Sequence, residues 1–243
     1  MGLLYLFQVA NQSYFRYIEY VIKIDPINVT QTNKVIGVRR LTKTTFGLKL
    51  ERNGFQFTPG QCVNIGLVDS AINREYSTYS GLHDGYLEFL VKEVDEGMVS
   101  PQLGSLNPGD EVSLDGAYGL FTIKEPKKKG LKYLFVASGT GIAPFHCYVK
   151  SYPGINYKVL HGVRLAEEQY DRDFYGKGRY ISCVSREKKG DFHGRVTDYL
   201  KKHPIDPETI CYLCGNKSMI NDVYDILREQ GVGGSNIVTE VFF

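Results

Sequence analysis

Short runs rich in strand-forming hydrophobic residues, broken by polar turn residues, fill the first half of the chain. Such runs occupy residues 34–38, 46–50 and 86–91. Turn-forming pairs, among them Pro59-Gly60, Asp84-Gly85 and Pro108-Gly109, separate the runs. Because these strands follow one another without helical segments between them, residues 34 to about 123 are predicted to form an antiparallel barrel or sandwich.

The second half of the chain has a different pattern, in which longer apolar runs alternate with helical segments. Strands are expected at residues 131–138, 158–162, 180–185 and 210–214. A helix is expected at 218–230, where apolar residues recur at helical spacing: Met219, Ile220, Val223, Ile226 and Leu227. Strand and helix in alternation predict a doubly wound parallel sheet.

A basic stretch at residues 125–130 separates the two patterns and is interpreted as the connector between domains. We therefore expect an N-terminal extension at 1–33, a β-barrel domain at 34–125 and an α/β domain at 126–243. The apolar run at 1–10 lacks a basic flank and is far shorter than the ~20 residues that cross a bilayer. No membrane span is expected.

Composition narrows the class of protein. Hydrophobic residues make up 42% and charged residues 23%, which is ordinary for a globular protein, and 29 basic against 27 acidic residues give no field that would attract nucleic acid. The 18 Tyr and 13 Phe fit either aromatic β-structure or a ring-binding site. Five irregularly spaced Cys indicate a reduced, cytoplasmic protein, and the five His, without partners at metal spacing, predict no metal site.

The first candidate site is Arg74-Glu75-Tyr76-Ser77. A flavin needs an apolar wall for its ring, a hydroxyl donor near N5 and a cation for its phosphate, and Arg, Tyr and Ser in alternate positions on one strand can supply these. The segment Gly97-Met98-Val99-Ser100 follows, with Gly and Ser where a helix N-terminus opens toward an anion. Taken alone, the tetrapeptide is also compatible with an ordinary strand.

The second candidate site begins at Gly139-Thr140-Gly141, directly after an apolar run. Paired glycines let backbone N–H groups approach a pyrophosphate at the start of a helix, although tight turns use the same residues. Arg164, Arg186 and Arg195 follow near the ends of later strands, where they would converge in the crevice of a parallel sheet. Convergent arginines favour NADP over NAD, because they suit a 2′-phosphate; the alternative is three surface arginines.

Cys211 and Cys214 have the spacing of a redox or metal pair. Positions three apart on an extended strand point to opposite faces, so no such pair is expected. Cys214 is expected at the carboxyl end of its strand, against the crevice.

Taken in order, these motifs resemble the ferredoxin–NADP reductase family over residues 34–243. The matching segments are 74–77, 97–103, 139–144, 184–187, 214–219 and 240–243. The resemblance implies an antiparallel β-barrel that binds FAD, followed by an α/β parallel-sheet domain that binds NADP(H). It also implies hydride transfer between NADP(H) and FAD, and passage of single electrons to or from a small carrier such as ferredoxin or flavodoxin.

By motif, the resemblance places Arg74 and Ser100 on the flavin diphosphate, Tyr76 against the ring and Ser77 near N5. It implies that Gly139, Thr140 and Gly141 face the pyrophosphate of the dinucleotide, and that Arg164, Ser185, Arg186 and Arg195 face its 2′-phosphate. Ser77, Cys214 and Glu240 are the candidate catalytic residues, the last two beside the nicotinamide. The remaining candidate cofactor-binding residues are Glu75, Gly97, Met98, Val99, Gly215, Met219, Phe242 and Phe243.

The chain departs from the family at its end, since plant-type members finish on Tyr and this sequence ends in Phe242-Phe243. One of these rings is expected to stack on the flavin. Two other functions stay open: an NADH-dependent reductase component that serves an oxygenase, and a non-catalytic flavin-binding protein. The close Cys cluster of a 2Fe–2S module, which would favour the oxygenase component, does not occur in this sequence.

Overall fold

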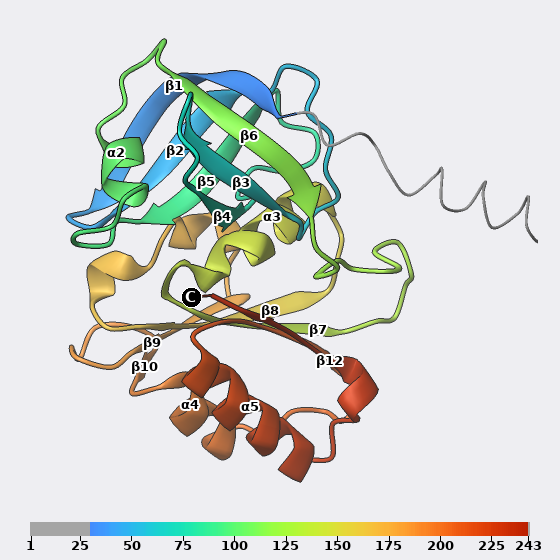
Figure 1. Ribbon diagram of the computed structural model, residues 1–243. Coiled ribbons are helices and arrows are strands. Elements are labelled where there is room, and N and C mark those ends of the chain that lie inside the picture. Colours follow the sequence, from blue (N-terminus) through green and yellow to red (C-terminus); the bar gives the residue numbers. More distant parts are fainter. Residues whose placement is uncertain (1–29, 243) are drawn as a thin grey trace, which may run out of the picture.

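The computed structural model describes residues 30–242, which form two sheets of six strands each, one above the other in Figure 1. Most of the expected N-terminal extension lies outside the described residues. Within them, no helix is long and apolar enough to cross a membrane. The same part of the chain holds no group of three or more His, Cys, Asp or Glu side chains placed to bind a metal ion.

The first sheet is entirely antiparallel. Its strands are β1 (Gln31–Thr42), β2 (Thr45–Glu51), β3 (Cys62–Leu67), β4 (Asn73–Ser77), β5 (Tyr86–Lys92) and β6 (Glu111–Tyr118), in the order β4-β3-β6-β1-β2-β5. The edge strands approach each other only at the bridge between Thr78 and Phe89, so the barrel is not closed by a full ladder. The predicted antiparallel barrel is confirmed, and the helix α2 (Ser100–Gly104) follows β5.

The first strand begins at Gln31 rather than at residue 34, because residues Gln31 to Lys34 pair with Leu114 to Glu111 of β6. Sequence periodicity missed this start for a physical reason. The fully buried side chain in this stretch is the polar Asn33, whose Nδ2 donates to the carbonyl of Glu51 at 2.7 Å. A buried amide that is hydrogen-bonded in this way leaves no hydrophobic signal.

The second sheet is entirely parallel, as predicted. Its strands are β7 (Tyr133–Ser138), β8 (Tyr157–Val163), β9 (Tyr180–Val184), β10 (Phe192–His193), β11 (Ile210–Gly215) and β12 (Ile237–Val241), in the order β10-β9-β8-β7-β11-β12. The order reverses direction between β7 and β11. In such a sheet, ligands bind beyond the carboxyl ends of the strands at this reversal point.

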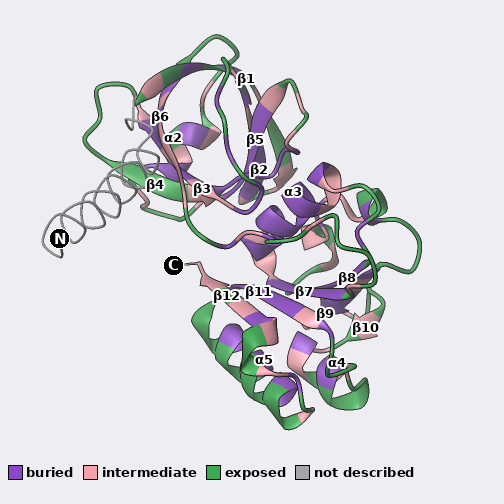
Figure 2. Cartoon of the chain, turned by 90° about the vertical axis from the view of Figure 1, so that its right-hand side faces the viewer, coloured by how far each residue is buried: buried purple, intermediate pink, exposed green. Residues whose placement is uncertain are grey.

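Helices cover both faces of the parallel sheet (Figure 1). The helix α3 (Ala143–Ser151) lies between the sheet and the barrel, whereas α4 (Val196–Lys202) and α5 (Lys217–Glu229) cover the far face. Figure 2 shows α4 and α5 exposed on their outer sides and buried toward the sheet. Short 3₁₀ turns complete the domain: η1 (Gly139–Ile142), η2 (Ala166–Glu168), η3 (Arg172–Tyr175) and η4 (Gly234–Asn236).

The two faces of the parallel sheet belong to different hydrophobic cores. Cys211 packs on the α4/α5 side and Cys214 on the barrel side, which confirms that these two thiols do not form a pair. The core on the barrel side is rich in aromatic rings, for example Phe135, Phe145 and Tyr148. Much of the Tyr and Phe surplus is therefore structural.

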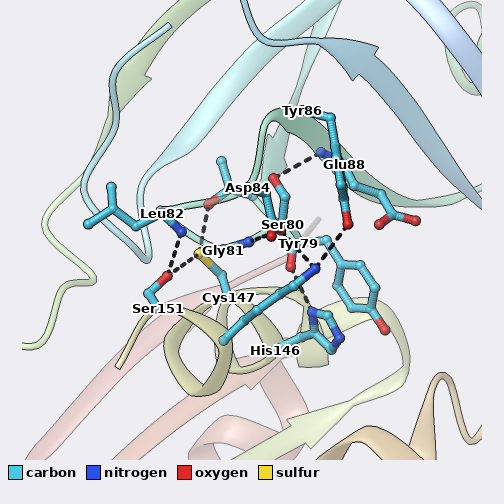
Figure 3. A network of polar contacts seen from close by, with 12 residues as sticks. Tyr79, Ser80, Gly81, Leu82, Asp84, Tyr86, Glu88, His146, Cys147 and Ser151 are labelled. Atoms are coloured by element: carbon cyan, nitrogen blue, oxygen red, sulfur yellow. Dashed lines mark hydrogen bonds and ion pairs between the residues drawn. The ribbon is translucent and has the colours of Figure 1, made fainter. Parts of the chain in front are cut away.

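Polar contacts join the barrel to α3 (Figure 3). The Ser151 hydroxyl accepts the backbone N–H of Leu82 at 2.8 Å, and Lys150 forms an ion pair with Asp84 at 2.7 Å. On the same side, the His146 ring donates from Nδ1 to the carbonyl of Tyr79 at 2.7 Å. These bonds tie the loop after β4 to the second domain.

A second set of contacts fastens the barrel to the segment between β8 and β9. The two terminal nitrogens of the Arg39 guanidinium donate to the Asp171 carboxylate at 2.9 and 2.7 Å. The Tyr79 hydroxyl donates to the same carboxylate at 2.8 Å. Although burial alone would raise the pKa of Asp171, these hydrogen bonds hold it below its usual value. Asp171 therefore stays charged at neutral pH and keeps the pair intact.

Candidate functional site

Three residues predicted to be catalytic meet where the two domains touch. Ser77 ends β4 of the barrel, while Cys214 and Glu240 are paired neighbours on β11 and β12 of the parallel sheet. The Ser77 hydroxyl lies 3.4 Å from Oε2 of Glu240, and the Cys214 thiol lies 3.9 Å from the same oxygen. One carboxyl group thus receives a donor from each domain.

The surroundings of Glu240 change its protonation. Burial raises its pKa to about 7, against hydrogen bonds from Ser77 and Cys214 that lower it, and the nearby charge of Glu75 raises it further. Burial also raises the pKa of the Cys214 thiol well above its usual value, so this sulfur stays protonated at neutral pH. Glu240 is therefore the group here that holds or releases a proton near neutrality, and Cys214 is a neutral neighbour.

The other residues of the tetrapeptide lie along β4, which pairs with β3. Arg74 is exposed, and its guanidinium donates to the carbonyl of Asn73 at 2.7 Å without a carboxylate partner among residues 30–242. Tyr76 packs against the barrel core, whereas Ser77, which follows it directly, turns toward Glu240. Arg, Tyr and Ser were expected in alternate positions on one strand, but Ser77 directly follows Tyr76, and adjacent residues of a strand point to opposite faces.

The segment after β5 differs from its prediction. Helix α2 has five residues, and its N-cap position is Val99, whose side chain makes no capping hydrogen bond, rather than Ser100. The buried Ser100 hydroxyl instead accepts the backbone N–H of Val94 at 3.0 Å and closes the turn that contains Gly97 and the exposed Met98. In the described part of the chain the hydroxyl hydrogen of Ser100 has no acceptor, so it can still be donated to a ligand.

A cleft of ≈ 790 Å³ opens beyond the carboxyl ends of β7, β8, β9 and β11. The predicted cofactor-binding residues that line it are Gly139, Thr140, Arg164, Ser185, Arg186, Arg195, Gly215, Met219 and Phe242. The structure therefore gathers nearly the whole predicted set at the reversal point of the sheet. Gly141 does not line the cleft. A Cβ at this position would lie 2.4 Å from the carbonyl oxygen of Cys214, so Gly141 serves the close approach of the turn to β11.

The arginines of the cleft have the properties that a phosphate site needs. Arg164, Arg186 and Arg195 are exposed, and within residues 30–242 their guanidinium groups have no carboxylate or hydrogen-bond partner. Arg186 is tied to Arg164 through the backbone, since its N–H donates to the carbonyl of Arg164 at 3.0 Å. Three unpaired cations at one end of the cleft fit a dianionic group.

Several residues of the cleft were missed in the sequence: Lys92, Glu168, Tyr170, Asn216 and Asp222. Asn216 had a readable signal, because it precedes a helix and caps it by accepting the N–H of Met219 at 2.9 Å. Lys92 had no such signal in the sequence. It belongs to the barrel, and the packing of the two domains brings its amino group to 3.9 Å from the Glu168 carboxylate at the cleft.

Phe242 lies at the border of the cleft and the barrel-side core. Its backbone N–H donates to the carbonyl of Gly215 at 2.8 Å, and its half-buried ring lines the cleft. The strand β12 that precedes it ends beneath the barrel (Figure 1). Phe243 lies outside the described residues.

Comparisons with known proteins agree with this geometry. Residues 28–123 match the oxidoreductase FAD-binding domain family. The chain is 30% identical over 217 residues to flavodoxin/ferredoxin–NADP reductase of Escherichia coli (strain K12), with 79% of this chain and 87% of that protein covered. It is 32% identical over 225 residues to the electron transfer component of toluate 1,2-dioxygenase from Pseudomonas putida, with 86% of this chain and 66% of that protein covered.

A solved structure shares the fold. The ferredoxin NADP+ reductase from Neisseria gonorrhoeae with bound FAD and NADP superposes with a TM-score of 0.79 at 22% identity, covering 88% of this chain and 99% of that one. The fold, the two adjoining sites and the sequence identity over most of the Escherichia coli enzyme lead to one conclusion. The chain belongs to the ferredoxin/flavodoxin–NADP(+) reductase family of FAD-dependent oxidoreductases.

Proposed function

We propose that Ser77, Cys214 and Glu240 form the hydride-transfer centre of this oxidoreductase, and that its partner is a small one-electron carrier, ferredoxin or flavodoxin. The observation that carries the proposal is the contact of Ser77 with Glu240. It joins the barrel strand expected to face the flavin to the end of the sheet whose cleft suits a dinucleotide. A reaction between two cofactors needs this adjacency of two sites.

The barrel side fits FAD in the chemistry of its donors. Arg74 supplies an exposed cation without a carboxylate partner in the described chain, and the Ser100 hydroxyl retains a hydrogen to donate. We assign both to the diphosphate. Tyr76 would border the ring, with Glu75, Gly97, Met98 and Val99 as further contacts.

The sheet side fits NADP(H). Arg164, Arg186 and Arg195, with Ser185, would hold the 2′-phosphate, and the turn at Gly139 and Thr140 would hold the pyrophosphate. Gly215, Met219 and Phe242 line the cleft nearer to Glu240. The cleft thus has a cationic end and an end beside the proposed hydride-transfer centre.

The bound cofactors supply the redox chemistry, in which hydride passes between nicotinamide and flavin and single electrons pass between flavin and carrier. The residues of the chain would orient the cofactors and protect the site from water. Ser77 presents a hydroxyl, the buried Cys214 keeps water from its side of the site, and Glu240 holds a proton at Oε2 or releases it near neutral pH. The ring of Phe242 lines the cleft.

The basic connector between the sheets is the candidate region for attracting an acidic carrier. Lys127, Lys128 and Lys129 are all exposed, but Lys128 forms an ion pair with Glu125 at 3.0 Å. Lys127 and Lys129 have no such partner within the described residues and would provide the attraction.

A reductase component that uses NADH and serves an oxygenase is the second candidate. The similarity to the toluate 1,2-dioxygenase component favours it. The three unpaired arginines of the cleft favour NADPH, because NADH has no 2′-phosphate to occupy them. A non-catalytic flavin-binding protein would have no use for the dinucleotide cleft.

Two measurements test the proposal. Purified protein should be yellow, and anaerobic NADPH should bleach it faster than NADH. The reduced protein should then pass electrons to ferredoxin or flavodoxin in stopped-flow experiments, with rates that fall as ionic strength rises. Faster bleaching by NADH together with efficient reduction of an oxygenase component, or rates independent of salt, would overturn the carrier assignment.

A further inference from the structure

His161 lies at the centre of β8 with both ring nitrogens hydrogen-bonded and no exposed surface. Its Nε2 is 2.8 Å from the carbonyl oxygen of Gly139, in the turn that lines the cleft. Its Nδ1 is 2.7 Å from the hydroxyl of Tyr180 on the neighbouring strand β9. A core histidine is thus bonded directly to the turn expected to hold the pyrophosphate.

The partners of His161 determine its tautomer. A carbonyl oxygen only accepts, so Nε2 must carry the hydrogen in this bond. Burial lowers the pKa of His161 to about 4, so the ring is neutral at physiological pH and Nδ1 is left as an acceptor. The Tyr180 hydroxyl can then donate to Nδ1, and it retains its hydrogen because burial raises the pKa of Tyr180. The Tyr180 hydroxyl thus donates to His161, and His161 donates to the carbonyl of Gly139.

This bond fixes the direction of the next backbone N–H. In a trans peptide the carbonyl of one residue and the N–H of the next point in opposite directions. With the carbonyl of Gly139 turned inward to His161, the N–H of Thr140 is directed away from the core, on the side where Gly139 and Thr140 border the cleft. A pyrophosphate oxygen in the cleft would accept that hydrogen.

Packing alone does not hold this peptide. Gly139 has a φ of +54°, and a Cβ built on it would meet nothing within 4 Å, so its outer side is open. Glycine populates both signs of φ, which lets the peptide rotate at little steric cost. Gly139 also begins the 3₁₀ turn η1, and the hydrogen bond from His161 is the side-chain contact that holds its carbonyl in this orientation.

We propose that His161 is a positioning residue for dinucleotide binding, which holds the Gly139–Thr140 peptide so that the N–H of Thr140 faces the pyrophosphate, with Tyr180 selecting its tautomer. The inference rests on the proposed NADP(H) site. It adds a device that prepares the site before the nucleotide arrives. Removal of the device should weaken contacts to the pyrophosphate and leave contacts to the distant 2′-phosphate unchanged.

Two probes separate these contacts in the FAD-loaded protein. NADP+ reaches both the turn and the arginines, whereas adenosine 2′-monophosphate has no pyrophosphate and reports on the arginines alone. We expect His161→Leu to raise the Kd of NADP+ about tenfold or more, as for loss of a hydrogen bond to a charged group, and to leave the Kd of adenosine 2′-monophosphate within about twofold. His161→Gln should recover most of the affinity, because its amide nitrogen can replace Nε2 as the donor.

A matched control is His146→Leu. His146 is also buried and donates to a backbone carbonyl, that of Tyr79, but it does not line the nucleotide cleft. This variant should change thermal stability without changing the ratio of the two dissociation constants. Equal loss of affinity for both probes in His161→Leu, or failure of His161→Gln to recover NADP+ binding, would overturn the proposal.

A measurement on the unaltered ring keeps the test decisive if His161→Leu does not fold. Long-range ¹H–¹⁵N spectra of the FAD-loaded protein should show the hydrogen of His161 on Nε2. In Tyr180→Phe the Nδ1 bond is lost, and NADP+ affinity should fall without a matching fall for adenosine 2′-monophosphate. A hydrogen on Nδ1 in the unaltered protein contradicts the inference. Absence of NADP+ binding by the unaltered protein contradicts the proposed function instead.

Discussion

The hydroxyl of Ser77 donates to the carboxylate of Glu240 across 3.4 Å and joins two residues that are 163 positions apart in the chain. Ser77 is the last residue of β4, and Glu240 lies on β12. The contact therefore forms only when both domains are folded and docked. The state of Glu240 therefore reports on the assembled site.

Glu240→Gln should stabilise the protein at alkaline pH. The raised pKa means that the folded protein favours the protonated carboxyl, so stability is lost as pH rises from 4.5 through about 7. The shift corresponds to about 3 kcal/mol, which solvent screening of the partly exposed group reduces to about 2. Glutamine carries no charge, so the variant should be more stable than the unaltered protein by about 2 kcal/mol at about pH 8 and nearly equal to it at about pH 5.

Urea unfolding of the FAD-loaded protein at both pH values measures this difference. Glu208→Gln is the control, because this exposed side chain has no hydrogen-bond partner among residues 30–242. A difference between Glu240→Gln and the unaltered protein that does not change with pH would show that the carboxyl is ionised throughout.

Arg186→Ala should reduce the preference for NADPH over NADH. The guanidinium is expected to bond the 2′-phosphate, and a hydrogen bond to a charged group contributes about 1.5–3 kcal/mol. The ratio of kcat/KM for the two coenzymes should therefore fall by about tenfold or more, mostly through KM for NADPH. Lys201→Ala, which removes an exposed cation from α4, should leave the ratio unchanged. A ratio near unity in the unaltered protein would contradict the assignment.

Arg74→Ala should weaken retention of FAD. The exposed cation on β4 is assigned to the flavin diphosphate, and its removal takes away one charge-assisted contact without disturbing the barrel core. Flavin absorbance per protein after gel filtration should fall, while thermal unfolding of the flavin-free form stays unchanged. Lys34→Ala, at an exposed position of β1, is the control. Equal flavin content in Arg74→Ala would remove the residue from the site.

Phe242→Ala should bind NADP+ more tightly than the unaltered protein and retain FAD. The ring lines the cleft, and the terminal rings are expected to cover the flavin face that the nicotinamide must reach. A ring that must leave this face costs binding free energy, and the shorter side chain removes that cost. Titration of NADP+ and single-turnover reduction by NADPH measure the effect. If affinity is unchanged or the protein unfolds, the ring instead fills the junction between the domains.

Much of the fold could be predicted because each half of the chain has one type of pattern. The first half has β-rich runs, and the second has apolar runs that alternate with helical segments. The β-rich runs became β1, β2 and β5, and the apolar runs became β7, β8, β9 and β11, whereas the two-residue strand β10 was not predicted. The start of β1 was missed because Asn33 is polar and buried, and the capping of α2 was misassigned because Ser100 uses its hydroxyl to close a turn. In each case a side-chain hydrogen bond to the backbone replaced the signal that hydrophobicity or capping preference would give.

The residues of the candidate site could be predicted from the sequence where they follow the ends of strands. Thr140, Arg164 and Arg186 lie in one cleft because the carboxyl ends of parallel strands meet at one edge. Lys92 and Tyr170 were not readable, since they reach the cleft through the docking of two domains. His161 was not singled out in the sequence, because its bond to the carbonyl of Gly139 depends on strand register, which a single sequence does not display.

The ion pair between Arg39 and Asp171 links the barrel to the segment between β8 and β9. Residues 119–132, which connect the sheets, contain no helix or strand, but the buried side chains of Phe121 and Ile123 fasten this connector to the barrel-side core. Asp171 fastens the opposite side, and the segment that carries it begins directly after Arg164 in the cleft. The segment therefore joins the border of the cleft to the barrel. Because the barrel is fastened both here and at the connector, we expect little hinge motion between the two domains.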